Sequence, residues 1–264
     1  MPRKGCTCGP PLISDVRRHS HMTSVLRRGH FLYVIIMAAS LEISATSVAD
    51  EPMLRAGEYI MEGGNGRLSL EKSQSGRFTF SIVGVGANNH VCSLDGEVEK
   101  TQEMIGGRPC LVSFHATAQG IEVGTETEGC RDYCGARADF SGHYLTPAKG
   151  CALAEVDETR RKFKELYDKK AFLQAKTTLE PVLSRCTATM NYLDSAWVRN
   201  DLAITQYRLK NFAACIGVLK PLSDVAASYE GVEVENVTPE LQGLVPVMKA
   251  TLVNLKLCGA RVRR

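Results

Sequence analysis

Residues 166–183 read LYDKKAFLQAKTTLEPVL, and residues 206–223 read QYRLKNFAACIGVLKPLS. A shift of 40 residues matches Tyr167 with Tyr207, Lys170 with Lys210, Phe172 with Phe212, Ala175 with Cys215, Leu179 with Leu219 and Pro181 with Pro221. Each stretch predicts the end of one helix, a short turn before the phenylalanine, and a second helix. A small residue three positions after the phenylalanine lets the two helices approach closely. Because one such hairpin cannot bury its apolar face alone, consecutive hairpins are expected to stack.

The same helical character extends from Cys151 onwards, where glycine becomes rare and helix-forming residues dominate. Asp157 is a candidate N-cap, and Phe163, Leu166 and Tyr167 follow it at helical spacing. The sequence predicts five helices, at about 157–169, 172–187, 192–209, 212–227 and 239–257. Residues 227–239, with several valines and a glycine, predict a loop before the last helix.

This pattern of a tyrosine, a phenylalanine and a small residue resembles the tetratricopeptide repeat, a helical-hairpin module for protein–protein contact. The resemblance covers about residues 157–227. The usual tryptophan and glycine of the first helix are absent, since Thr159 and Phe163 stand there in the first copy. The period of 40 also exceeds the usual period of about 34. The last helix is expected to cap the pair of hairpins.

The resemblance implies that the first helix of each hairpin faces a groove that binds a protein or peptide. The expected partner-binding residues are Arg160, Lys164, Trp197, Asn200 and Tyr207, accompanied by Asp157, Tyr167 and Ile204. Aromatic residues and arginine are favoured at binding hot spots. The alternative is that Trp197 and Tyr207 pack in the core, as sparse aromatic residues commonly do.

The region from Gly57 to about Tyr144 has a different period. In GRFTFSIVGV, residues 76–85, apolar and polar side chains alternate, which predicts a half-buried strand. Further strands are expected from Val91, over 110–116 and over 121–123, with tight turns between them. The chain therefore predicts an α+β protein. A small antiparallel β meander, a barrel or a sandwich, occupies residues 50–152, and an all-α domain of repeat-like hairpins occupies 153–264.

Residues 22–49 have the three parts of a secretory signal peptide. Arg27 and Arg28 precede an apolar run of 11 residues, Phe31 to Leu41, and Ala49 ends a small-residue cleavage site. The run is shorter than the roughly 20 residues of a membrane-spanning helix. We expect translation to start at Met22, and export to a periplasmic or secreted location without a membrane anchor.

The charge of the chain argues against nucleic acid as a partner. The chain has 32 Lys and Arg against 29 Asp and Glu. Residues 1–49 hold six of these bases and two of these acids, which leaves 26 against 27. A nucleic-acid binder needs a basic patch or stripe, and residues 50–264 contain no dense basic run.

Eight cysteines follow the leader: Cys92, Cys110, Cys130, Cys134, Cys151, Cys186, Cys215 and Cys258. An even number in an exported chain predicts disulfides. Neighbouring strands favour Cys92 with Cys110, and the helical half favours Cys186 with Cys215. Cys130 and Cys134 either close on each other around a turn or bond to different elements, with Cys151 as a candidate partner.

Two other functions are conceivable for the stretch around these cysteines. A catalytic pair of Cys134 with His115 or His143 is conceivable, but disulfides compete for the same thiol. Cys130 and Cys134 have zinc-like spacing, but no second pair accompanies them. No catalytic residue, metal site or cofactor is therefore predicted.

Residues 140–153, FSGHYLTPAKGCAL, are similar to bacterial inhibitors of lysozymes, which are small exported β barrels with a Ser-Gly-x-x-Tyr motif and a later Lys-Gly segment. Here one residue, His143, and not two, separates Gly142 from Tyr144. This resemblance implies Ser141, Tyr144 and Lys149 as inhibitory residues. The chain as a whole resembles exported bacterial proteins that combine a Cys-rich β domain with helical repeats. The sequence thus favours a non-enzymatic protein that binds a protein or peptide, with a hydrolase inhibitor and a cysteine enzyme as alternatives.

Overall fold

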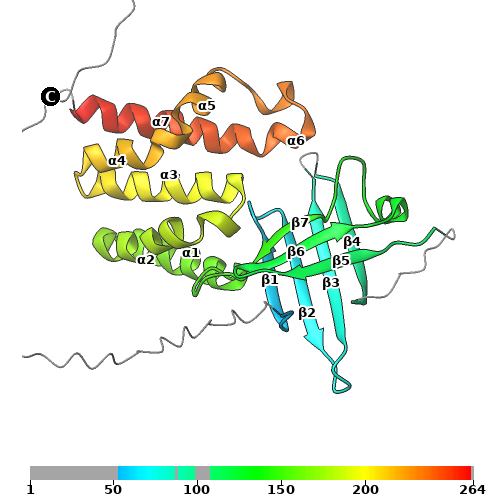
Figure 1. Cartoon of the computed structure of the whole chain (residues 1–264). Coiled ribbons are helices and arrows are strands. Elements are labelled where there is room, and N and C mark those ends of the chain that lie inside the picture. Colours follow the sequence, from blue (N-terminus) through cyan, green and yellow to red (C-terminus); the bar gives the residue numbers. More distant parts are fainter. Residues whose placement is uncertain (1–52, 87–88, 99–107, 263–264) are drawn as a thin grey trace, which may run out of the picture. The chain divides into compact units, whose positions relative to one another are not determined.

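The computed structural model describes residues 53–86, 89–98 and 108–262. Met22, the signal-peptide segment 22–49 and the first cysteines lie outside the described residues. The described chain is a mixed α+β fold, in which a curled antiparallel sheet is followed by helices (Figure 1). This confirms the predicted fold class at that level.

The sheet contains seven strands and curls into a half-barrel (Figure 1). The strands are β1 (Gly57–Met61), β2 (Gly66–Lys72), β3 (Phe78–Val85), β4 (Val91–Glu97), β5 (Val112–Ala116), β6 (Gly120–Thr125) and β7 (Gly142–Leu145). Their order in space is β4-β3-β2-β1-β7-β6-β5, with antiparallel neighbours throughout. The pairing of β1 with β7 therefore joins a four-stranded meander to the later strands and leaves β4 and β5 as edges.

The alternation in β3 decides which side of the sheet is the core. Phe80 and Ile82 are buried, and Thr79 and Ser81, which alternate with them, are exposed. Leu68 and Leu70 on β2 lie opposite those two residues in the register and are also buried. The period of two predicted from the sequence is confirmed here.

Residues 126–140, which we call the strap, run between the two edge strands. The strap contains the 3₁₀ helix η1 (Glu128–Tyr133). At one end the Glu126 amide donates to the Leu111 carbonyl at 2.8 Å, and at the other the Gly135 amide donates to the Val91 carbonyl at 3.1 Å. The strap thus fastens the β5 side of the half-barrel to its β4 side.

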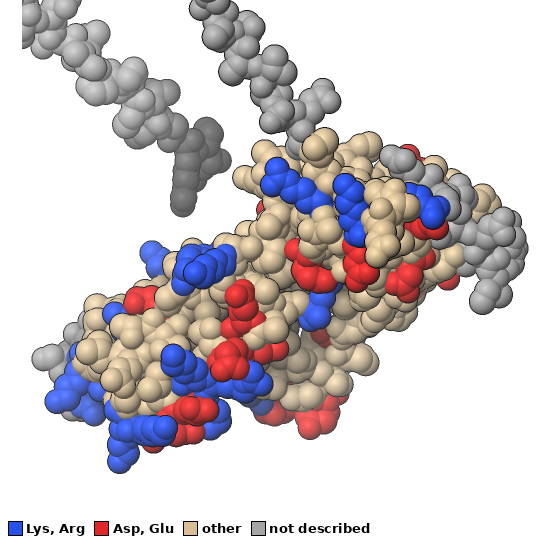
Figure 2. All heavy atoms as spheres, turned by 90° about the horizontal axis from the view of Figure 1, so that it is seen from below, with Lys and Arg blue, Asp and Glu red and all other residues tan. Residues whose placement is uncertain are grey.

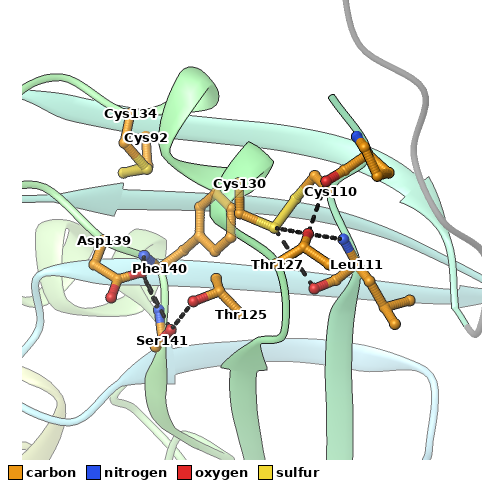
Figure 3. The surroundings of a disulfide bond; sticks show 11 residues. Cys92, Cys110, Leu111, Thr125, Thr127, Cys130, Cys134, Asp139, Phe140 and Ser141 are labelled. Atoms are coloured by element: carbon orange, nitrogen blue, oxygen red, sulfur yellow. Dashed lines mark hydrogen bonds between the residues drawn. A yellow bond between two sulfur atoms is a disulfide. The ribbon is translucent and has the colours of Figure 1, made fainter. Parts of the chain in front are cut away.

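Among the described residues, four disulfides are present: Cys92–Cys134, Cys110–Cys130, Cys151–Cys186 and Cys215–Cys258. Two of them hold the strap (Figure 3). Four disulfides indicate an oxidising, extracellular-type environment. Within the residues that the structure describes, no helix combines the length and the apolar character that crossing a bilayer requires.

The pairings predicted from the sequence are wrong, although the cysteines involved are the right ones. Cys92 and Cys110 do not pair because β4 and β5 lie at opposite ends of the sheet order, and the strap stands between them. Cys130 and Cys134 accordingly bond to different elements. Cys186 pairs with Cys151 because the start of α1 and the end of α2 meet in an antiparallel hairpin.

The helical part has helices in all five expected ranges, but α1 begins at Leu153, so Asp157 lies inside it and is not its N-cap. Its α helices are α1 (Leu153–Asp168), α2 (Phe172–Arg185), α3 (Tyr192–Arg208), α4 (Phe212–Leu219), α5 (Ser223–Ser228), α6 (Pro239–Gln242) and α7 (Leu244–Val262). Three short 3₁₀ helices, η2 (Thr187–Thr189), η3 (Lys220–Leu222) and η4 (Val234–Asn236), connect them. The predicted fourth helix is divided into α4, η3 and α5, where Pro221 follows α4. The predicted last helix is divided at Gly243 into α6 and α7.

Several of the residues matched by the 40-residue shift have similar environments. Lys170 and Lys210 end their helices in the left-handed conformation, with φ of 60° and 62°. Ala175 and Cys215 are both fully buried where the second helix of each hairpin packs. Tyr167 contacts Phe172 with ring centroids 5.2 Å apart, and Tyr207 contacts Phe212 at 5.7 Å.

The turn between β1 and β2 touches the segment that follows α2. The Gly63 amide donates to the Ala188 carbonyl at 2.8 Å. Gly64 has a φ of +75°, and a Cβ atom there would lie 2.2 Å from the Asn191 nitrogen. Only glycine fits this close approach.

Candidate functional site

A hollow of about 630 Å³, which we call the α1–α3 groove, lies on the helical part. Its lining residues come from one face of α1 and from Asp201 of α3: Asp157, Arg160, Arg161, Phe163, Lys164, Tyr167, Asp168 and Asp201. Two of the predicted binding residues, Arg160 and Lys164, lie in this groove, together with Asp157 and Tyr167. Its size is within the usual range for ligand sites in proteins.

Two side-chain contacts span the groove. Nη1 of Arg160 lies 3.4 Å from Oδ1 of Asp194 near the start of α3. Towards the other end, Nε of Arg208 donates to the Tyr167 hydroxyl at 3.3 Å. Asp194, Asp201 and Arg208 follow one another at intervals of seven residues, so they share one side of α3. Asp201 therefore lies between the two contacts.

Local packing fixes the position of each helix that forms the groove. At the start of α1, the Glu155 carboxylate accepts the amides of Gly150 and Ala152 at 3.0 and 3.2 Å. At the start of α3, Oδ1 of Asn191 accepts the Asp194 amide at 2.8 Å. Such caps satisfy amides that a helix leaves unpaired at its start.

The aromatic part of the groove is rigid. Phe163 is buried, and its ring centroid lies 5.8 Å from that of Tyr167. Tyr167 in turn contacts Phe172 of α2. Packing on two sides restricts the Tyr167 ring, which presents a fixed apolar surface to anything that enters the groove.

The charged side chains of the groove are mostly exposed and paired with neighbours. Lys164 contacts Asp168 at 2.7 Å, and Arg161 contacts Glu158. Exposed pairs of this kind contribute little to stability, so a bound carboxylate or ammonium group can replace one partner at small cost. Figure 2 shows acidic and basic side chains interspersed over one face of the molecule.

Among the acidic residues of the groove, Asp201 has the carboxyl group whose pKa is shifted most. Burial raises the pKa of its carboxyl from 3.8 to about 6, while nearby Arg160 acts in the opposite direction. A partly buried carboxylate is attracted more strongly by a cation than an exposed carboxylate is, because less water screens the two charges. Sequence reasoning missed Asp201, although its seven-residue spacing from Asp194 and Arg208 was a usable signal.

No family model, curated protein or solved structure matches this chain. The side chains of the groove themselves define its chemistry. They provide hydrogen-bond donors from Arg160 and Lys164, a partly buried acceptor from Asp201, and an aromatic surface from Tyr167. This combination suits a polar segment of peptide that carries charges of both signs.

Asn200 does not belong to the groove, and its predicted exposure is wrong. The side chain is only 3% exposed. Its amide nitrogen donates to the Ala196 carbonyl at 3.0 Å and to the Thr251 hydroxyl at 2.9 Å. Its oxygen accepts from Asn254 at 2.9 Å. Asn200 therefore joins α3 to α7. The residue of α3 that lines the groove is its neighbour Asp201, so the expected groove-facing side of α3 was wrong by one residue.

The two predicted aromatic residues of α3 lie elsewhere too. Trp197 is half-buried against the core cluster that contains Leu219 and Met248. Tyr207 packs on Phe212 and lines a different hollow beside α7. Of the expected binding residues, Arg160 and Lys164 on α1 therefore lie in the groove, whereas those on α3 lie outside it.

The three residues suggested by the inhibitor resemblance do not form a common surface. Tyr144 is fully buried, and its hydroxyl donates to the Phe140 carbonyl at 3.0 Å. The Ser141 hydroxyl lies 3.1 Å from both Asp139 and Thr125 (Figure 3). Lys149 alone is exposed. Tyr144 therefore acts in the β core and has no access to a partner.

The cysteines carry no free thiol in the part of the chain that the structure describes. Cys134 is bonded to Cys92, so it cannot serve as a nucleophile with His115 or His143. His143 instead lies 3.9 Å from Glu122 on the exposed side of the sheet. Over the described ranges, no cluster of three or more His, Cys, Asp or Glu side chains is arranged to hold a metal ion.

Proposed function

We propose that this chain is an exported, non-enzymatic protein of the bacterial envelope that binds a protein or peptide segment in the α1–α3 groove. The bound segment lies along α1, with a basic group directed at Asp201 and an acidic group at Arg160 or Lys164. Its location is periplasmic or secreted, and the leader at 22–49 directs the export.

One observation carries this proposal. The groove is formed by the first helices of two successive hairpins, and long side chains from α1 and α3 meet across it at Arg160–Asp194 and Tyr167–Arg208. Helical hairpins that stack in register expose such a shared face for recognition. The tetratricopeptide-like pattern at 166–183 and 206–223 supports the same use of that face.

The compartment supports a binding role as well. Four disulfides and two fastened sheet edges suit a chain that must persist without chaperones in an oxidising environment. A rigid scaffold limits the entropy that is lost on binding, because the groove side chains are held before the partner arrives.

A peptide library displayed on phage and selected against the purified oxidised protein tests the proposal. Enriched peptides are measured by fluorescence anisotropy against Lys164→Glu and against Lys162→Glu. Lys162 is an exposed residue of the same helix that does not line the groove. We expect Lys164→Glu to weaken binding about tenfold, which corresponds to about 1.4 kcal/mol.

The Lys162→Glu variant has the same charge change and is expected to bind like the parent protein. Circular dichroism spectra that match for all three proteins exclude unfolding as the cause. Equal losses in both variants, or no loss in either, would place the binding site outside the groove.

A further inference from the structure

A second hollow, which we call the α7 hollow, lies between α7 and the turn after α5. Its volume is about 680 Å³. Tyr229, Glu230 and Gly231 form the wall on the side of that turn, and residues 249–261 form the wall on the side of α7. It is distinct from the α1–α3 groove, since the two hollows share no lining residue.

The α7 wall is apolar where a helix surface is usually polar. Val253 is 57% exposed and Leu257 is 39% exposed, although both are large hydrophobic residues. They stand four residues apart, so they lie one above the other on the same face of α7. Leu252 and Ala260 extend this strip within the hollow. Exposed apolar surface that is gathered in a hollow indicates a binding site.

The ionisable side chains that line the hollow are mainly basic. Lys249, Lys256 and Arg261 contribute cations, and Glu230 contributes the carboxylate. Lys249 is engaged with Glu233 at 2.6 Å. Among the residues that the structure describes, no acidic side chain forms an ion pair with Lys256 or Arg261. Two cations thus remain available at the edge of an apolar strip.

We propose that the α7 hollow binds a long-chain carboxylate. The alkyl chain lies along Val253 and Leu257, and the carboxylate is held by Lys256 and Arg261. Burying each methylene group of such a chain is favourable by about 0.8 kcal/mol, so a chain of about twelve carbons suffices for measurable affinity. The volume of the hollow is of the size that small amphiphilic molecules occupy, and the basic edge selects an anionic headgroup.

Isothermal titration calorimetry on the purified oxidised protein tests this assignment with three probes of equal chain length. The probes are dodecanoate and dodecyltrimethylammonium, each below its micelle concentration, and dodecanol below its solubility limit. We expect dodecanoate to bind at a single site. We expect the cationic probe to bind at least about tenfold more weakly, a difference of about 1.4 kcal/mol.

Two sets of variants locate the site. Leu257→Gln removes part of the apolar strip, and we expect it to weaken dodecanoate binding about tenfold. Its control is Leu173→Gln on α2, where a leucine that is 64% exposed lies outside the hollow. The double variant Lys256→Glu and Arg261→Glu is expected to reverse the preference between the anionic and cationic probes.

Three results would overturn the assignment. The first is equal affinity for the anionic and cationic probes, which indicates unselective adsorption. The second is an equal loss of binding in Leu257→Gln and Leu173→Gln. The third is that dodecanoate does not bind but an acidic amphipathic peptide does. The α7 hollow would then be a docking site for a helix.

Discussion

Asn200 and Asp201 show at the scale of single residues how helix register decides between core and surface. The two side chains are neighbours in sequence, but Asn200 bonds to Thr251 and Asn254 in the interior, while Asp201 reaches the α1–α3 groove. A polar residue on a helix predicts exposure only when the helix is covered on a single side and its other sides face solvent. Because α3 packs against α2, α4 and α7, its exposed strip is narrow.

The raised pKa of Asp201 predicts a pH dependence of stability. The folded-state pKa of about 6 exceeds the unfolded value of about 3.9, so the folded state binds more protons between these values. The contribution of Asp201 to the free energy of unfolding is therefore fully present below about pH 4 and is lost as the pH rises through about 6. We expect Asp201→Asn to stabilise the protein at pH 7 by about 1 to 2 kcal/mol more than at pH 4, allowing for partial solvation.

Urea unfolding of both proteins at pH 4 and pH 7 measures this difference. Asp224→Asn on α5, which removes an exposed carboxylate, is the control for the loss of one negative charge. If Asp201→Asn changes stability equally at both pH values, the Asp201 carboxyl is not buried as the structure indicates.

Elements were predictable where they depend on local periodicity. The alternation of Phe80 and Ile82 predicts β3, and the spacing of Phe163 and Tyr167 predicts α1 within a few residues. The pairing of the sheet was not predictable, because the contact of β1 with β7 joins residues that are far apart in sequence. That contact places β4 and β5 at opposite edges, and the strap between them then determines two of the disulfides.

The strap predicts the effect of removing its disulfides. Cys92–Cys134 closes a sequence separation of 42 residues, and Cys110–Cys130 closes 20. Loop-closure entropy then gives about 4 and 3 kcal/mol of stabilisation, respectively. We expect the double variant Cys92→Ser and Cys134→Ser to lower the free energy of unfolding in urea by about 3 to 4 kcal/mol, and the pair Cys110→Ser and Cys130→Ser by slightly less.

Mass spectrometry of the intact variants confirms that the other three disulfides remain formed. An unchanged urea midpoint in both double variants would show that the strap does not hold the edges of the half-barrel together.

At the scale of the whole molecule, the sequence predicted the division into strands followed by helices and the use of all eight later cysteines as disulfides. Arg160 and Lys164, which the sequence placed on one face of a helix, do lie together in the α1–α3 groove, and their role in binding stays a prediction. Which residues of α3 reach the groove could not be predicted, because that depends on how α7 covers Asn200. Repeat-like stacking stays a prediction, which the matching turns at Lys170 and Lys210 favour.

Nuclear magnetic resonance shows directly whether the α1–α3 groove receives a peptide. Backbone amide shifts of the isotope-labelled oxidised protein are recorded during titration with a peptide selected on the parent protein. We predict that the largest changes fall on α1 around Arg160 and Lys164 and on α3 around Asp201. Changes confined to the sheet or to the α7 hollow, with the amides of α1 unmoved, would contradict the account.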